Sequence, residues 1–126
     1  MNLVDSSGWL EYFADGANAD FFASPIEDVD HLIVPTLCLL EVFKRILQQR
    51  GEDRALQAIA LMYQGQVVAL DASIAVNAGK LGFDLKLPLA DSVILATAKA
   101  QNALIWTQDS DFKDIEGVRY IPWKKK

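Results

Sequence analysis

The sequence contains one cysteine and one histidine in 126 residues, and this shortage excludes several kinds of site. A single thiol, Cys38, forms no internal disulfide and builds no zinc centre from cysteine ligands. We therefore expect a chain that folds without cross-links in a reducing compartment. Cys38 stands between two leucines and is predicted to be a small buried side chain, not a nucleophile. His31 is expected at the start of a strand, where a general-base role is disfavoured.

Long hydrophobic runs are also missing. The longest stretch without a charged residue, 55–70, has 16 residues and contains three glutamines, whereas a membrane-spanning helix needs about 20 mainly apolar residues. The N-terminus has neither the basic start nor the apolar segment of a secretory signal. We therefore expect a cytoplasmic protein without a membrane partner.

No internal repeat, low-complexity block or flexible linker divides the chain, and its length suits one domain spanning residues 1–126. Seventeen Asp and Glu residues oppose twelve Lys and Arg residues, so the net charge is −5. An acidic balance argues against a nucleic-acid partner held by overall charge. If four acids were committed to a bound cation, however, 13 acids would remain against 12 bases.

Short apolar segments alternate with longer amphipathic ones along the chain. This alternation predicts an α/β fold, a three-layer α/β/α sandwich with a central parallel sheet of four to five strands. Pro25 is predicted to end the second helix, and Thr36 and Asp71 to cap the helices that follow them. Strands are expected at 2–5, 31–34, 66–70, 104–107 and 118–121, and helices at 9–14, 17–23, 36–49, 52–64, 72–85 and 90–102, with a short helical turn at 110–114.

Two acids follow predicted strands. Asp5 ends the first strand, and Asp109 lies just past the strand at 104–107. Sites in open parallel sheets form beyond the carboxyl ends of the strands, so both acids are candidate site residues. Each also has a simpler interpretation, because a carboxylate at the start of a helix binds free amide groups.

Two further acids lie in helices that have little polar surface. Glu41 either forms a surface ion pair with Arg45 one turn later, or is covered by apolar neighbours and needs a partner. Asp91 is either a first-turn acid favoured by the helix dipole, or a buried acid that requires a cation. A single site that gathers all four acids explains their positions better than four separate, unrelated roles. Crowded carboxylates share protons or bind a metal ion, and oxygen ligands suit Mg²⁺ or Mn²⁺.

The motifs that contain these acids resemble those of the PIN-domain ribonucleases, specifically the VapC-type toxins of bacterial toxin–antitoxin pairs. Each motif is short, but their order and spacing match over essentially the whole chain. The motifs are Val4-Asp5-Ser6-Ser7, the Glu41 helix after Pro35-Thr36, the run from Leu89 to Ala98, and the run from Trp106 to Phe112.

The resemblance implies an endoribonuclease that cleaves structured RNA, such as transfer or ribosomal RNA, with a metal-activated water. It also implies one or two Mg²⁺ or Mn²⁺ ions, a homodimer, and a cognate antitoxin whose tail covers the active site. By resemblance, the acidic quartet that holds the metal is Asp5, Glu41, Asp91 and Asp109, and small hydroxyl residues beside it are Ser6, Ser7 and Thr107.

Several alternatives remain open at this point. Asp109 is favoured over Asp111 as the fourth acid, because its position after Thr107 matches the family and Asp111 more plausibly anchors the next turn. A non-catalytic PIN-like module would only engage an antitoxin partner and would leave RNA intact. Receiver-type and haloacid-dehalogenase-type domains are disfavoured, because Val4, Ser6 and Ser7 stand where these would need a second acid.

Two features bear on RNA binding. Trp9 follows the Ser6-Ser7 turn and could touch RNA, but packing is its default role. No basic cluster is evident in the sequence, so RNA affinity would have to come from basic residues arranged around the site. The candidates are Lys44, Arg45, Lys86, Lys99, Lys113 and Arg119.

Overall fold

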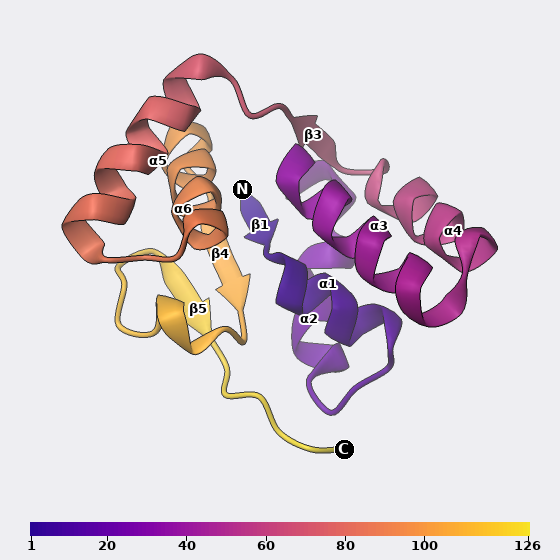
Figure 1. The fold of residues 1–126 in the computed structure, drawn as a ribbon. Coiled ribbons are helices and arrows are strands. Elements are labelled where there is room, and N and C mark those ends of the chain that lie inside the picture. Colours follow the sequence, from indigo (N-terminus) through magenta and orange to yellow (C-terminus); the bar gives the residue numbers. More distant parts are fainter.

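Five short strands form one sheet in which every neighbouring pair is parallel. A computed structural model describes all of residues 1–126, and Figure 1 shows how its elements are arranged. The strand order is β3-β2-β1-β4-β5, which confirms the predicted parallel sheet. The strands are β1 (Asn2–Val4), β2 (Leu32–Pro35), β3 (Gln66–Val68), β4 (Leu104–Thr107) and β5 (Val118–Tyr120).

Pairs of helices connect the first four strands. Right-handed crossovers place connections that run in opposite directions along a sheet on opposite faces. The pair α5–α6, which leads back from β3 to β4, therefore covers the face opposite α1–α2, as in the predicted three-layer sandwich. The helices are α1 (Ser6–Phe13), α2 (Ala19–Glu27), α3 (Thr36–Arg50), α4 (Glu52–Met62), α5 (Ala72–Leu85) and α6 (Leu89–Gln101), with short 3₁₀ helices at Val29–His31 and Ser110–Phe112.

Strand β1 lies at the centre of the sheet, between β2 and β4. The chain leaves β1 towards β2 on one side and later returns from β3 to β4 on the other side. Val4 pairs with Trp106, and the Asp5 N–H continues the pairing to the Trp106 carbonyl at 3.2 Å. Such a reversal of strand order opens a crevice beyond the strand ends. The residues that follow β1 and β4 therefore share one edge of the sheet.

The sheet is buried on both faces, as its apolar strands require. Leu3, Val4, Ile33 and Val34 are completely inaccessible, and burying each such side chain contributes about 1.5–3 kcal/mol. Helix α6 is buried at every position from 92 to 98, because it packs on both the sheet and α5. The first turn of α6, which carries Asp91, thus leads directly into a fully buried stretch of helix.

Some predicted element boundaries are wrong. Helix α2 continues through Pro25 to Glu27; Pro25 is buried, and packing stabilises the last turn although proline has no N–H to donate. Thr36 does not cap α3, because its Oγ1 instead accepts the Leu70 N–H at 3.2 Å. Asp71 caps α5 as predicted, accepting the Ile74 N–H at 2.8 Å. No helix combines the length and apolar character needed to cross a membrane.

Candidate functional site

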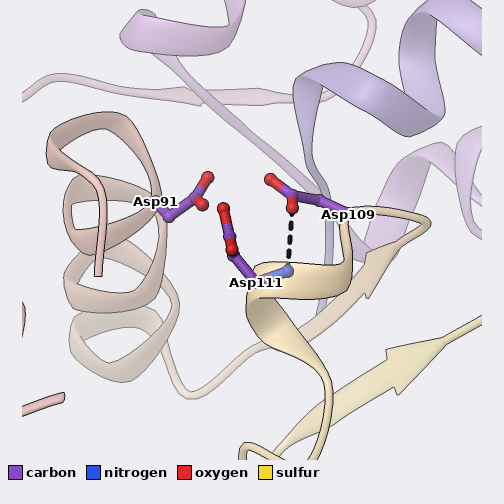
Figure 2. Close-up of side chains that lie close together, drawn as sticks. All are labelled: Asp91, Asp109 and Asp111. Atoms are coloured by element: carbon purple, nitrogen blue, oxygen red, sulfur yellow. Dashed lines mark hydrogen bonds between the residues drawn. The ribbon is translucent and has the colours of Figure 1, made fainter. Parts of the chain in front are cut away.

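Three carboxylates from two segments meet at the edge of the sheet where β1 and β4 end. Asp91 lies in the first turn of α6, Asp109 follows β4, and Asp111 lies in the 3₁₀ helix after it. One carboxylate oxygen from each lies within 4.8 Å of the others. Figure 2 shows Asp91 pointing towards Asp109 and Asp111, while the Asp111 N–H donates to Asp109 Oδ1 at 2.9 Å. We call these three residues the acid cluster.

No basic side chain offsets the charge of the acid cluster. The three ion pairs of the molecule involve Asp15, Asp28 and Asp84 instead. Burial, the charge of Asp109 and a hydrogen bond with it, and the further charges of Asp111 and Asp5 raise the pKa of Asp91 to about 8. The cluster therefore holds a proton at neutral pH unless a cation replaces it.

Asp5 lies beside the acid cluster in a different environment. It is 4% exposed and accepts hydrogen bonds from Ser7 Oγ at 2.7 Å, the Gly8 N–H at 3.0 Å and Thr107 Oγ1 at 2.6 Å. Burial outweighs these bonds and, with the charge of Asp109, raises the pKa of Asp5 to about 6. A carboxylate has about four lone-pair sites, so one stays available for a cation. Asp5 also caps α1 through Gly8, so the helix-cap interpretation is confirmed, while its role in a metal site stays a prediction.

Thr107 joins the two strand ends. Its hydroxyl is fully buried, donates to Asp5 Oδ2 and accepts the Asp109 N–H at 2.9 Å. The last residue of β4 thereby fixes the carboxylate that follows β1 and the backbone of the acid that follows β4. Asp5 and Asp109 are held in register by one side chain.

Glu41 is connected to this site through a serine. Ser6 Oγ donates to Glu41 Oε1 at 2.6 Å, while the adjacent Ser7 donates to Asp5. Glu41 is half-buried and forms no ion pair with Arg45, so the surface-pair interpretation is wrong. It lies outside the group of three acids within 4.8 Å. The structure thus gathers Asp91, Asp109 and Asp111 closely, and links Glu41 to them only through the Ser6-Ser7 turn.

Two polar residues of the site, Asn18 and Gln108, are not among those expected from the sequence. Gln108 accepts a hydrogen bond from Asn18 Nδ2 at 3.0 Å, and its N–H donates to Ser7 Oγ at 3.4 Å. Asn18 is 2% exposed and also donates to the Pro122 carbonyl at 3.0 Å. These contacts fix the segment between Thr107 and Asp109 against the turn after β1. A polar residue next to a strand end is the one clue that could have indicated Gln108.

The donor set fits a hard divalent cation. Every potential ligand in the acid cluster and on Asp5 is a carboxylate oxygen, which Mg²⁺ and Mn²⁺ prefer. Because these unneutralised carboxylates lie close together, they attract a cation more strongly than bulk water does.

A family model described as the PIN domain matches residues 3–118, which is nearly the whole chain. The chain belongs to the PIN domain family. The resemblance seen in the sequence motifs is therefore confirmed, and the parallel sheet and its flanking helices are those of a PIN domain.

Solved structures that share this PIN-domain fold include toxins of toxin–antitoxin pairs. A toxin–antitoxin complex from Klebsiella pneumoniae matches with a TM-score of 0.80 and 23% identity, over 98% of this chain and 99% of that one. VapC20 from Mycobacterium tuberculosis, described as a sarcin–ricin loop cleaving toxin, matches with a TM-score of 0.76 and 15% identity, over 92% of this chain and 95% of that one. VapBC2 from Rickettsia felis, bound to a promoter DNA fragment, matches with a TM-score of 0.76 and 14% identity, over 98% of each chain. No curated protein matches the chain significantly.

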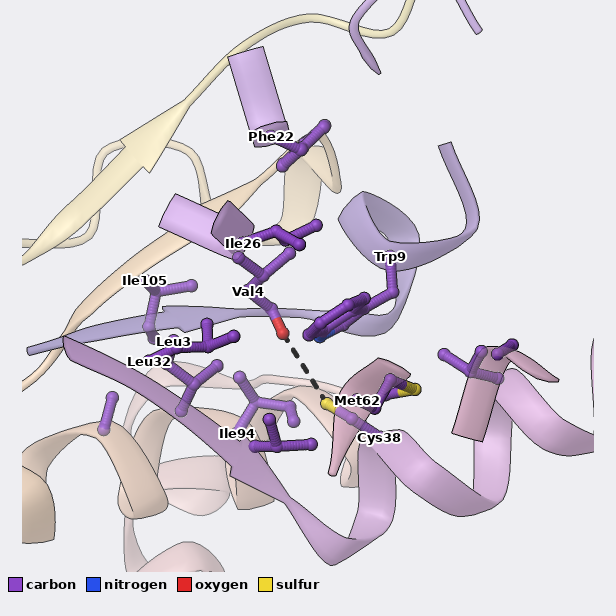
Figure 3. Close-up of a cluster of buried hydrophobic side chains, with 14 of the residues drawn as sticks. Leu3, Val4, Trp9, Phe22, Ile26, Leu32, Cys38, Met62, Ile94 and Ile105 are labelled. Atoms are coloured by element: carbon purple, nitrogen blue, oxygen red, sulfur yellow. Dashed lines mark hydrogen bonds between the residues drawn. The ribbon is translucent and has the colours of Figure 1, made fainter. Parts of the chain in front are cut away.

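Two residues of the PIN domain that could have suggested other chemistry lie in its core (Figure 3). Trp9 is 0% exposed, so it packs as expected and presents no surface to RNA. Cys38 is also fully inaccessible; its thiol donates to the Val4 carbonyl at 3.8 Å, and burial raises its pKa. His31 is exposed, pairs with Asp28 and precedes β2, at the edge of the sheet opposite the acids.

Proposed function

We propose that this PIN domain is a metal-dependent endoribonuclease that acts as the toxin of a type II toxin–antitoxin system. The observation that carries the proposal is the acid cluster, in which three carboxylates converge without any basic partner. A structural carboxylate group would be expected to pair with Lys or Arg. Convergence of unpaired acids at the switch point of a parallel sheet is typical of a metal-binding active site.

In this proposal, Asp5, Glu41, Asp91 and Asp109 hold Mg²⁺ or Mn²⁺, and Asp111 adds a carboxylate beside Asp91. A bound divalent ion supplies a water of lowered pKa and offsets negative charge on the phosphate during hydrolysis. The residues that orient the acids are Ser6, Ser7 and Thr107.

The hydroxyl residues prepare the site before any ligand arrives. Ser7 and Thr107 each donate a hydrogen bond to a different oxygen of Asp5, and Ser6 donates one to Glu41 Oε1. Because these donors are fixed by helix α1 and strand β4, the two carboxylates need little rearrangement on binding. Such preorganisation is a large part of catalytic power in sites that handle charge.

The kinds of protein that share the fold support the proposed toxin role and partners. Several of the solved structures are toxin–antitoxin complexes, which supports a cognate antitoxin as partner. One of the toxins is described as cleaving the sarcin–ricin loop. We propose a structured RNA, transfer or ribosomal, as the substrate, a homodimer as the active form, and the cytoplasm as the site of action.

RNA cleavage by the purified protein tests the enzymatic part of the proposal. Total RNA is incubated with wild-type protein and with Asp91→Asn, in EDTA and in Mn²⁺. We expect discrete fragments from the wild type in Mn²⁺ alone, and none from Asp91→Asn. Asp30→Asn, which removes an exposed acid from the 3₁₀ helix before β2, is the control and should cleave normally.

Equal cleavage by Asp91→Asn and the wild type would reject this site. A protein that binds an antitoxin tightly yet leaves all RNA intact would instead establish the non-catalytic module.

Growth of the expressing cells tests the toxin role separately. Induction of the wild-type chain should arrest growth, and co-expression of the antitoxin encoded beside it should relieve the arrest. Asp91→Asn should not arrest growth at the same protein level. Arrest by both forms would show that the toxicity does not come from the acid cluster.

A further inference from the structure

A pocket of about 640 Å³ lies beside the acids, between helices α1, α3 and α4. Ser7 and Gln108 form one of its walls, and Ser7 donates directly to Asp5. The pocket therefore opens next to the site instead of on a remote face. None of the contacts described so far uses the rest of its surface.

Three of the four arginines of the chain line this pocket. Arg45 and Arg50 come from α3 and Arg54 from the first turn of α4, and all three are exposed. No ion pair of the molecule involves an arginine. The single acid in the lining, Glu11, is 8% exposed, and its Oε2 accepts the Asn18 N–H at 2.8 Å. Although the protein is acidic overall, three arginines without ion pairs line this one pocket.

An exposed aromatic ring also borders the pocket, and basic residues follow it in the sequence. Trp123 is 63% exposed and borders the pocket, whereas Trp9 is completely buried. Lys124 and Lys125 follow it, and then Lys126, whose charge is paired with Asp15. The tail is held in place because the Pro122 carbonyl accepts Asn18 Nδ2 and Lys126 contacts Asp15. We call this pocket, together with the segment from Trp123 to Lys126, the arginine groove.

The composition of the arginine groove is that of a surface for single-stranded nucleic acid. Such surfaces combine basic side chains that follow the phosphates with aromatic rings on which bases stack. Apolar side chains such as Leu10, Phe13 and Ile46 line the groove and can cover the faces of unstacked bases.

The position of the groove matches the path of a substrate. Glu41 and Arg45 stand one turn apart on α3, about 6 Å along the helix axis. An RNA strand whose phosphate lies at the acids must continue away from them. The arginine groove offers it a basic surface that begins at Ser7 and Gln108, the sequence neighbours of residues at the site.

We propose that the arginine groove binds the single-stranded stretch of RNA next to the cleaved bond. Arg45, Arg50 and Arg54 contact its phosphates, and Trp123 stacks on one of its bases. This inference rests on the proposed nuclease function and assigns the surface by which the substrate is held. An acidic peptide is the competing occupant, and the test below distinguishes the two.

RNA binding without cleavage tests the groove directly. A fluorescent single-stranded RNA of mixed sequence is titrated with the full chain in EDTA, and its anisotropy is followed over a range of salt concentrations. For single strands each phosphate contact adds about 0.7 to the slope of log K against log salt, so each lost arginine should weaken binding about fivefold near 0.1 M salt. Arg50→Gln and Arg54→Gln should each show this loss, and the double variant about 25-fold.

Lys80→Gln is the matched control, because it removes the same charge from α5, where Lys80 pairs with Asp84. Its RNA affinity and salt slope should stay within about twofold of wild type. Equal losses of RNA affinity in Lys80→Gln and the arginine variants would show that only the net charge of the protein matters. This result would overturn the inference.

Trp123 gives an independent readout. Trp123→Ala should weaken RNA binding at least about fivefold, because stacking on an aromatic ring contributes substantially for each base, whereas Trp123→Phe should restore most of the affinity. In the wild type, RNA should protect the exposed tryptophan from quenching by acrylamide. No change in quenching on saturation with RNA would contradict the stacking.

The outcomes separate this inference from the proposed function. If the arginine variants lose RNA affinity but the wild type never cleaves RNA, the groove stands and the nuclease proposal fails. If the wild type cleaves RNA but the arginine variants bind RNA normally, the groove assignment is wrong. Normal RNA binding by these variants, together with lost affinity for a Glu-rich amphipathic peptide, would assign the groove to a protein partner instead.

Discussion

The two sides of the site are stabilised in opposite ways. On the side of β1, Asp5 is buried, and three donors hold its two oxygens. On the side of α6, Asp91 faces two other carboxylates and has no donor of opposite charge. Hydrogen bonds from the protein hold the carboxylate on the first side, whereas the charges on the second side are balanced only by protons or by a cation.

This difference separates the part of the proposed metal site that hydrogen bonds already hold in place from the part whose charges still need a cation. The shift in the pKa of Asp5 from 3.8 to about 6 corresponds to about 3 kcal/mol at neutral pH, which the surrounding core has to offset. This cost keeps a carboxylate buried and fixed at the proposed metal site. Asp91 lies on a well-packed helix but stays close to two like charges, and relief of this repulsion would favour the proposed cation. The predictions below test this division in order of decreasing effect.

Removing a charge from the unbalanced side should abolish function and spare the fold. In Asp91→Asn, RNA cleavage should fall at least about 100-fold, because a ligand to the metal is lost. The metal-free variant should melt at the same temperature as wild type or higher at pH 8, because one of three crowded charges is gone. Cleavage assays and thermal melts check both. A large loss of stability would show that Asp91 is structural.

Removing a donor from the hydrogen-bonded side should damage both function and stability. Thr107→Val keeps the buried shape but removes the hydroxyl between Asp5 and the Asp109 N–H. We expect about 1–3 kcal/mol lower stability and about 10–100-fold slower cleavage. Urea unfolding and cleavage rates measure these losses.

Thr97→Val is the control for this prediction. Thr97 is also buried, but its hydroxyl only donates to the Val93 carbonyl within α6. Its replacement should leave the cleavage rate within about twofold of wild type. Comparable catalytic losses at both threonines would remove the special role assigned to Thr107.

Within the acid cluster, the two acids after β4 should differ. The charge of Asp109 raises the pKa of both Asp5 and Asp91. Asp111 is exposed, and its charge raises the pKa of Asp91 alone. Asp109→Asn should therefore slow cleavage about tenfold more than Asp111→Asn. The reverse order would make Asp111 the fourth acid of the quartet. Rates at saturating Mn²⁺ decide between them.

The smallest effect is a pH-dependent response of stability to Mg²⁺. Asp5 and Asp91 have folded-state pKa values of about 6 and about 8, above the ordinary 3.8. The folded protein therefore binds more protons than the unfolded chain, so stability of the metal-free protein falls as pH rises from about 4 to 8. Mg²⁺ competes with those protons and should raise the melting temperature by about 5 °C more at pH 8 than at pH 5. An equal shift at both pH values would contradict metal binding at these acids.

The sequence predicts the sheet and the place of the acids because both follow from local patterns. Short apolar runs identify the strands, and the strand-end rule then selects Asp5 and Asp109. The grouping of Asp111 with Asp91 is not predictable in this way, because it depends on the 3₁₀ turn after Asp109 and on the packing of α6. The arginine groove is likewise invisible, since Arg45 and Trp123 are brought together only by the tertiary fold.

The pairing of β1 with β4 also determines when the site can assemble. Asn2 lies next to Leu104 in the sheet, and the acid cluster requires Asp109 and Asp111, which lie more than 100 residues after Asp5 in the sequence. A nascent chain emerging from the ribosome exposes Asp5 and Glu41 long before these partners exist. Because contacts between distant segments form late in folding, the site cannot assemble until the segment that carries Asp109 and Asp111 has been synthesised and has packed beside β1.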